Sequence, residues 1–84
     1  MYEVYLERGA EKDLRRLTPD DLKRVIMALR DLAGDPRPAG CRKLAGSKSD
    51  WRIRTGERRV LYEIDDKAKA IHVMRIRHRS DAYK

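Results

Sequence analysis

From Glu7 on, the hydrophobic period of the chain changes once, near Pro38, and this change limits the folds open to it. Before it, apolar residues recur every three or four positions, which is typical of amphipathic helices; after it, apolar and polar residues alternate, which is typical of strands. A chain of 84 residues makes one small domain that can bury a modest core without a metal or a disulfide. The sequence therefore predicts a small single α+β domain over residues 1–84, with helices packed on one sheet.

The first part predicts a strand followed by a helical hairpin. Tyr2–Leu6 alternates and carries aromatic and β-branched residues, which favours a short strand. Glu7–Leu17 predicts a charged first helix. Thr18 is a suitable N-cap for a second helix because proline and two acidic residues follow it. That helix has one apolar stripe and a possible end at Gly34; the stripe comprises Leu22, Val25, Ile26, Leu29 and Leu32.

The second part predicts an antiparallel meander of three or four strands. Cys41–Leu44 favours a weak strand or a turn. The three clearer strands are Asp50–Arg54, Arg58–Ile64 and Ala70–Arg77, and short turns join them. If the helical hairpin covers one face of this sheet, the other face remains available for function.

The positive charge is concentrated in the second half of the sequence. The net charge is +7, yet residues 1–40 hold eight basic and eight acidic residues, whereas residues 41–84 hold thirteen and six. A one-sided positive field attracts polyanions, with nucleic acid the first expectation and an acidic protein or anionic membrane the next. A basic surface that serves only solubility is the alternative.

Several classes of protein are excluded or disfavoured by what the sequence lacks. The single cysteine, Cys41, excludes an internal disulfide and fits a reducing cytoplasm. No run of residues is long and apolar enough for a transmembrane helix, and the start has no signal-peptide pattern. The spacing of the two histidines and the cysteine matches no metal site, and no carboxylate pair suits two-metal catalysis or glycoside hydrolysis.

Arginines from three predicted strands converge on one region of the sheet. Strand alternation and the turns between strands bring together Arg52, Arg54, Arg59 and Arg77. Like charges placed side by side repel, and guanidinium groups bind phosphate oxygens in a bidentate fork. These residues therefore predict a phosphate-binding face, with a solvated basic edge as the alternative. Trp51 could stack on a base, but its alternation with Ile53 favours the core.

The two histidines predict different roles. His72 lies inside the last strand, where a partly buried structural histidine is expected. His78 is predicted just beyond the end of that strand, next to Arg77 and Arg79, whose charges favour the neutral imidazole. It could accept or deliver a proton, or it could be an exposed histidine in a terminal tail.

Four motifs in a fixed order give the chain a family resemblance. They are K-L-x-G at 43–46, an aromatic-R-I-R strand at 51–54, R-R-V-L-Y at 58–62 followed by I-D-D, and H-R-x-D-x-Y at 78–83. Together with the order of predicted elements, they resemble the RelE side of the RelE/ParE toxin superfamily of toxin–antitoxin systems. The resemblance extends over essentially the whole chain.

The resemblance implies a cytoplasmic toxin that inhibits translation. Such an enzyme cuts mRNA in the ribosomal A site without a metal or small-molecule cofactor: the 2′-hydroxyl attacks the adjacent phosphate and leaves a 2′,3′-cyclic phosphate and a 5′-hydroxyl. Carried over by motif, the catalytic positions are Arg52, Arg54, Arg59, Arg77 and Tyr83, with Arg79 an alternative to Arg77. The expected RNA-binding positions are Lys43, Lys48, His78 and Arg79. The implied partners are the ribosome, its mRNA and a cognate antitoxin.

One departure from the family pattern leaves the general base open. Some relatives have lysines where this chain has Arg52 and Arg54, and an arginine effectively cannot lose its proton. We expect these arginines to hold phosphate, while His78, Tyr83 or ribosomal RNA supplies the group that takes the proton. Two other functions remain open: a ParE-like DNA gyrase inhibitor that cleaves no RNA, and an inactive RNA- or protein-binding module.

Overall fold

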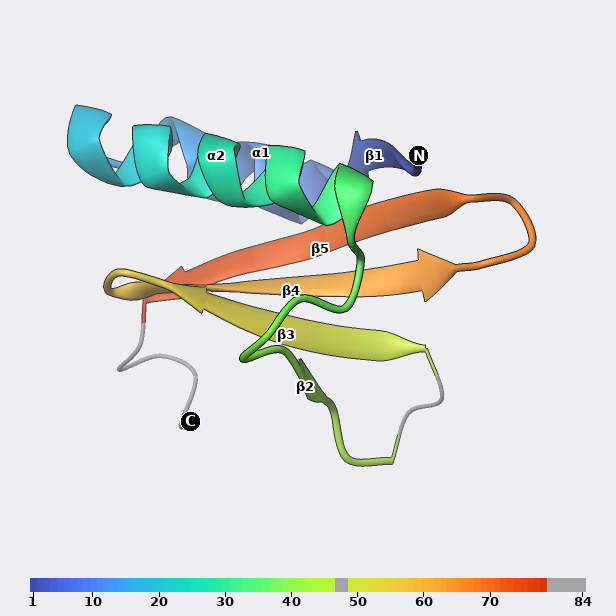
Figure 1. The fold of residues 1–84 in the computed structure, drawn as a ribbon. Coiled ribbons are helices and arrows are strands. Elements are labelled where there is room, and N and C mark those ends of the chain that lie inside the picture. The colour runs from blue at the N-terminus through green and yellow to red at the C-terminus, as the bar shows by residue number, and fades with distance from the viewer. Residues whose placement is uncertain (47–48, 79–84) are drawn as a thin grey trace.

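The computed structural model describes residues 1–46 and 49–78 as one sheet with two helices. The elements in chain order are β1 (Glu3–Leu6), α1 (Arg8–Arg15), α2 (Pro19–Gly34), β2 (Arg42–Lys43), β3 (Asp50–Thr55), β4 (Arg58–Asp65) and β5 (Ala70–His78). The strand order is β1-β5-β4-β3-β2. Both helices lie against the same face of this sheet (Figure 1). Neither helix is long and apolar enough to cross a membrane.

The predicted α+β architecture is confirmed, and the sheet is larger than the predicted meander. β3, β4 and β5 form the expected antiparallel meander, and the short β2 extends it at one edge. At the opposite edge, β1 pairs with β5 in parallel, with Glu3 opposite Ala70 and Leu6 opposite Val73. A parallel pair needs a crossover connection, and here the two helices and the rest of the sheet separate the two strands. The result is a five-stranded mixed sheet.

Local sequence explains where α2 begins and how it is oriented. The Thr18 hydroxyl accepts a hydrogen bond from the Asp21 backbone N–H at 3.2 Å, and proline occupies the first helical position as predicted. The buried members of its stripe are Val25, Leu29 and Leu32. Each such side chain stabilises the fold by about 1.5–3 kcal/mol through burial. The stripe fixes which side of α2 contacts the sheet.

The core lies between the helices and one face of the sheet. The strands contribute buried side chains to it from β4 and β5: Val60, Tyr62, Ile64, Ile71, Val73 and Ile76. The Tyr62 hydroxyl donates to the Pro36 carbonyl at 2.8 Å, which fastens the segment after α2 to this core. Trp51 packs against the cluster as predicted, and the Arg37 guanidinium lies 5.2 Å from the centre of its ring system.

A β-bulge in β5 reverses the alternation of that strand. Tyr62 lies opposite Val73, but Leu61 lies opposite Arg75, so Met74 is the extra residue. Val73 and Ile76, three positions apart, are therefore both buried on the helix side. Without the bulge, simple alternation would place Arg75 and Arg77 on that side. The bulge leaves Arg77 on the face that the helices do not cover.

The second half of β5 forms a backbone hydrogen bond with Asp13 of α1 instead of pairing with β1. β1 ends at Leu6, and the Asp13 carboxylate accepts the backbone N–H of Ile76 at 2.8 Å. The same carboxylate accepts two hydrogen bonds from the Arg75 guanidinium, at 2.9 and 3.2 Å. Partial burial acts to raise the pKa of Asp13, but the hydrogen bonds from Arg75 and Ile76 outweigh it and hold that pKa below its ordinary value.

Candidate phosphate-binding site

Three arginines lie in one row across the uncovered face of the sheet. Strand register places Arg54 of β3 opposite Arg59 of β4, and Arg59 opposite Arg77 of β5. Neighbouring strands are about 4.8 Å apart, so the three Cα atoms span roughly 10 Å. Arg59 is only 5% exposed although it is charged. A row of this kind concentrates positive charge at the centre of the sheet.

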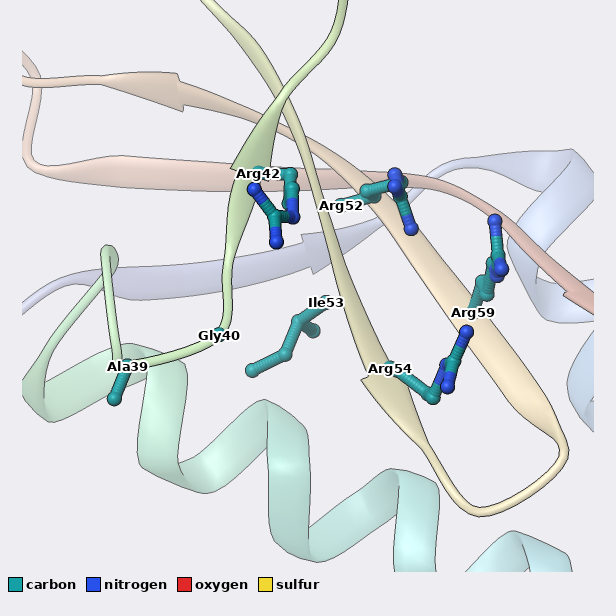
Figure 2. Close-up of a pocket in the computed structure, with 7 residues that line it drawn as sticks. All are labelled: Ala39, Gly40, Arg42, Arg52, Ile53, Arg54 and Arg59. Atoms are coloured by element: carbon teal, nitrogen blue, oxygen red, sulfur yellow. The ribbon is translucent and has the colours of Figure 1, made fainter.

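A second row beside the first completes a basic pocket. Arg42 of β2 lies opposite Arg52 of β3, one alternation step along the strand from Arg54. Four arginines, Arg42, Arg52, Arg54 and Arg59, line a hollow of about 490 Å³ together with Ala39, Gly40 and Ile53. Figure 2 shows the guanidinium groups of Arg52, Arg54 and Arg59 on the same side of β3 and β4, and Arg42 on the adjoining edge strand. We call this hollow the arginine pocket.

The electrostatics of the arginine pocket favour an anionic ligand. Like charges directly opposite on neighbouring strands destabilise a sheet by a few tenths of a kcal/mol or more. Among the described residues, Asp50 and Glu63 lie opposite each other on this face, toward the other end of the strands. The described part of the uncovered face therefore has a basic end and an acidic end along its strands. A phosphate at the basic end would offset the repulsion through charge-assisted, bidentate hydrogen bonds.

The structure brings together most of the described residues that the sequence selected. Arg52, Arg54 and Arg59 line the arginine pocket. Arg77 lies opposite Arg59, but it also lines a separate hollow toward α1. Lys43 is exposed in β2, opposite Trp51, and alternation turns it away from the arginine pocket. Three selected residues, Lys48, Arg79 and Tyr83, lie outside the described residues.

Arg42 is a pocket residue that sequence reasoning missed. The segment Cys41–Leu44 was expected to be a weak strand or a turn, so no partner was assigned to its residues. The structure pairs Arg42 with Arg52, which places both guanidinium groups on the uncovered face. The alternation of Arg52 with Trp51 would have identified Arg42 once the pairing of the short strand was known.

The histidines occupy two different surroundings. His72 lies half-buried in β5 and stacks on Tyr5 of β1, with 5.4 Å between ring centres, which is a structural contact. His78 is the last residue of β5 rather than the first beyond it. It lies opposite Arg58, with its Nε2 atom 4.0 Å from a carboxylate oxygen of Glu57. Alternation places His78 on the other side of β5 from Arg77.

The described residues hold no group of three or more histidine, cysteine, aspartate or glutamate side chains placed to bind a metal ion. The chemistry that the arginine pocket offers is charge stabilisation by fixed donors. Guanidinium groups can hold a phosphate and stabilise extra negative charge on it, but they cannot act as general bases at physiological pH. Any proton transfer at the pocket needs another group.

Comparison with known proteins defines the class. Residues 4–83 match the family described as the ParE toxin of type II toxin–antitoxin systems, parDE. The chain is 37% identical over 87 residues to Toxin RelG of Mycobacterium tuberculosis, covering 99% of this chain and 97% of the relative. It is 30% identical to the putative toxin RelE1 of Methanocaldococcus jannaschii, covering 99% and 96%.

Solved structures share the fold over nearly their full length. The toxin–antitoxin complex RelBE2 from Mycobacterium tuberculosis contains a chain with a TM-score of 0.82 and 30% identity, covering 93% of this chain and 98% of that one. A chain of the archaeal RelE–RelB complex from Pyrococcus horikoshii has a TM-score of 0.83 and 26% identity, covering 93% and 94%. The fold is that of a small toxin of a type II toxin–antitoxin system. The chain belongs to the RelE/ParE toxin superfamily, and its fold is RelE-like.

Proposed function

We propose that this toxin is a metal-independent endoribonuclease that cleaves mRNA in the ribosomal A site. The observation that supports the proposal most is the row of Arg54, Arg59 and Arg77 across the uncovered face, with Arg59 almost fully buried beside the arginine pocket. A row of like charges costs stability in the free protein, and an RNA phosphate is the ligand that would offset this cost.

The proposed reaction uses the 2′-hydroxyl of the message as the nucleophile. Its oxygen forms a bond to the adjacent phosphorus, the bond from phosphorus to the 5′-oxygen breaks, and the 5′-oxygen takes up a proton. The products are a 2′,3′-cyclic phosphate and a 5′-hydroxyl. The intermediate phosphorane carries more negative charge than the starting phosphodiester, so fixed guanidinium groups stabilise it more than the substrate. Arg59 and Arg77 are assigned this role, while Arg52 and Arg54 hold the phosphate.

The 2′-hydroxyl must give up its proton as it attacks, and the arginines of the pocket cannot accept it. We propose His78 as a helper and Tyr83, by resemblance, as a residue that contacts the base. His78 lies on the α1 side of Arg77, so it would act at the edge of the site rather than inside the arginine pocket. Single-turnover cleavage by His78→Ala across pH 5–8 examines this role. An unchanged pH–rate profile would remove His78 from the proton transfer.

Expression of the toxin without an antitoxin distinguishes mRNA cleavage from inhibition of DNA gyrase. We expect 5′-hydroxyl mRNA ends in phase with the reading frame, and a loss of about 10²–10³-fold in cleavage rate for Arg59→Ala. Arg30→Ala is the matched control, because Arg30 is exposed on α2, outside the arginine pocket. Cleavage ends that persist in Arg59→Ala would overturn the assignment of the site.

The match to the ParE family supports one rival function, inhibition of DNA gyrase without RNA cleavage. This function predicts growth arrest with intact mRNA and DNA damage. It also predicts that Arg59→Ala leaves toxicity unchanged unless the arginine pocket contacts the gyrase. The same expression experiment therefore distinguishes the two targets.

We propose a cognate antitoxin as the protein partner, since the relatives of known structure include the RelBE2 complex and the archaeal RelE–RelB complex. A hollow of about 420 Å³ lies between α2 and β3, and Met27 in its lining is 56% exposed. This hollow and the arginine pocket share Ala39, Ile53 and Arg54. An acidic amphipathic helix in the hollow could reach the arginine pocket and cover it.

A substitution in this hollow tests the antitoxin surface. Met27→Glu places a charge where an apolar contact is proposed, so we expect antitoxin affinity to fall at least about tenfold. Lys23→Gln lowers the charge of α2 by the same one unit at an exposed position outside the hollow, and it controls for the change in charge. Calorimetric titration of each variant with the antitoxin gives the comparison. Equal affinities would place the antitoxin elsewhere.

A further inference from the structure

α1 carries a basic stripe that the proposed cleavage reaction does not use. Arg8, Lys12 and Arg16 are four residues apart, so their side chains lie along one side of the helix and its C-cap. We call these three residues the α1 stripe. All three are exposed. The equal numbers of basic and acidic residues in the first half of the sequence conceal this local excess of charge.

The positive charges of the α1 stripe lower the stability of the helix. Like charges four residues apart destabilise a helix by a few tenths of a kcal/mol per pair. Arg8 lies in the first turn of α1, where the helix dipole disfavours a cation. Within residues 1–46 and 49–78, no acidic side chain forms an ion pair with the stripe. The nearby Asp13 carboxylate instead accepts hydrogen bonds from Arg75 and from the Ile76 backbone.

Two connected hollows join the α1 stripe to the uncovered face of the sheet. The stripe lines a hollow of about 350 Å³ together with Arg75. A second hollow, of about 180 Å³, shares Asp13, Arg16 and Arg75 with the first and reaches Arg77. Arg77 in turn lies opposite Arg59, which lines the arginine pocket. A path of cations therefore runs from β3 across β4 and β5 to α1.

The close approach of α1 to β5 keeps this path continuous. A Cβ atom on Gly9 would lie 2.7 Å from Cδ of Arg75 and 3.3 Å from the Met74 carbonyl oxygen. Only glycine lets the Arg75 side chain lie across the helix at this point. Asp13 then fixes its guanidinium group between the two hollows.

We propose that the α1 stripe, with Arg75 and Arg77, is a second RNA-binding site that contacts backbone phosphates beyond the one that is cleaved. The identity of the ligand rests on the proposed function. The arginine row alone spans roughly 10 Å, and α1 lies beyond its end, so the path is longer than the spacing between successive phosphates. The phosphates can belong to message nucleotides next to the cut or to ribosomal RNA, and the experiment below separates these sources.

The test compares two triple variants that each remove three positive charges. One variant carries Arg8→Gln, Lys12→Gln and Arg16→Gln in the α1 stripe. The control carries Lys23→Gln, Arg30→Gln and Lys67→Gln, which are exposed positions outside both hollows. The first probes are single-stranded RNAs of three and twelve nucleotides, with a 2′-deoxy nucleotide at the cleavage position so that neither can be cut. The second probe is the vacant ribosome without message. Thermal melting confirms that both variants fold.

If the stripe contacts the message, its variant binds the twelve-nucleotide RNA at least about tenfold more weakly at low salt, and the slope of log affinity against log salt falls by about 2. The three-nucleotide RNA and the control variant show neither change. If the stripe contacts ribosomal RNA, the same loss is seen with vacant ribosomes and not with the twelve-nucleotide RNA. Either result supports the proposal.

Three results would overturn the proposal. They are equal losses for the two triple variants, no loss for either, or a loss that is confined to antitoxin binding. Failure of the proposed function gives a different result, because the parent toxin would then leave mRNA intact, or Arg59→Ala would cleave it to the same extent as the parent toxin. The binding of uncleavable RNA does not depend on that outcome.

Discussion

Arg59 combines two properties that rarely occur together, a positive charge and almost complete burial. Its neighbours across the ladder are Arg54 and Arg77, so two further guanidinium groups extend from the adjacent strands. A pre-formed cluster of this kind needs no rearrangement to meet a phosphate, and this is what an electrostatic catalyst requires. Like charges directly opposite on neighbouring strands also act against the stability of a sheet.

Removing one charge from the row should therefore raise the stability of the toxin and lower its cleavage activity. We expect Arg54→Gln to raise the free energy of unfolding by about 0.2–1 kcal/mol, because it removes a like-charge pair with Arg59. Cleavage should fall in the same variant. Urea denaturation and initial cleavage rates provide the two measurements, and Arg30→Gln on α2 is the control. A less stable Arg54→Gln would mean that the arginine stabilises the fold through contacts other than the row.

At the scale of elements, the junction of α1 with β5 decides where Arg77 lies. β1 ends at Leu6, so the second half of β5 has no neighbouring strand on that side. The Asp13 carboxylate lies at this edge of β5 in place of a strand, and it accepts hydrogen bonds from the Ile76 backbone and from Arg75. The bulge at Met74 lies in the same stretch. Helix and bulge together hold the arginine-bearing end of the strand in register with β4.

Loss of this junction should reduce both stability and catalysis. We expect Asp13→Ala to lower the free energy of unfolding by about 1–3 kcal/mol, because it leaves the Ile76 N–H and the Arg75 guanidinium without their acceptor. Asp13→Asn should recover part of the loss, since its side-chain oxygen can still accept from Ile76. Glu11→Ala, also on α1 and exposed, controls for helix propensity.

The cleavage rate distinguishes a positioning role for Asp13 from simple destabilisation. Well below the melting temperature, Asp13→Ala should lower kcat more than it raises KM, since a displaced Arg77 weakens contacts made in the transition state. A kcat equal to that of the parent toxin under those conditions would show that Asp13 supports the fold alone.

The elements themselves were largely predictable because their signals are local. Thr18 and Pro19 begin α2 as capping chemistry predicts, and its apolar stripe identifies the buried side. The bounds of the three long strands agree with the predicted bounds to within one residue. The first helix is shorter than expected, ending at Arg15, because Arg16 and Leu17 form a turn that leads into the next cap. The role of Arg42 could not be predicted, because a two-residue strand has too short a pattern to indicate its partner.

At the scale of the whole molecule, two aspartates connect distant parts of the chain. Asp13 joins α1 to β5, and Asp66 joins the β4–β5 turn to Arg37 and to Tyr2 near the N-terminus. Hydrogen bonds from Arg37 and then from Tyr2 lower the pKa of Asp66 to about 2. The pKa of Asp13 is also below its ordinary value.

These lowered pKa values predict how stability depends on pH. A carboxyl group with a depressed pKa in the folded state contributes stability that is present above its unfolded pKa, near 4, and is lost as the pH falls through the folded value. We therefore expect the melting temperature to fall between about pH 4 and pH 2, and Asp13→Asn to show a smaller fall. Calorimetry across this range gives the result. A melting temperature that is constant below pH 4 would contradict both assignments.

The sequence by itself determined the class of fold, the extent of α2, the three long strands and the family resemblance. Each of these depends on residues that are close in the chain, through capping, alternation or a compact motif. It also selected Arg52, Arg54, Arg59 and Arg77. For the first three the selection has a local basis, because a short turn joins their two strands and alternation then places them on one face.

Only the tertiary structure decided how the arginine row is completed. Simple alternation from Ile71 and Val73 would turn Arg77 toward the helices, and the bulge at Met74 turns it to the uncovered face instead. The parallel pairing of β1 with β5 and the contact of Asp13 with Ile76 likewise join residues far apart in sequence. Such contacts depend on the packing of the whole chain, and no local pattern specifies them.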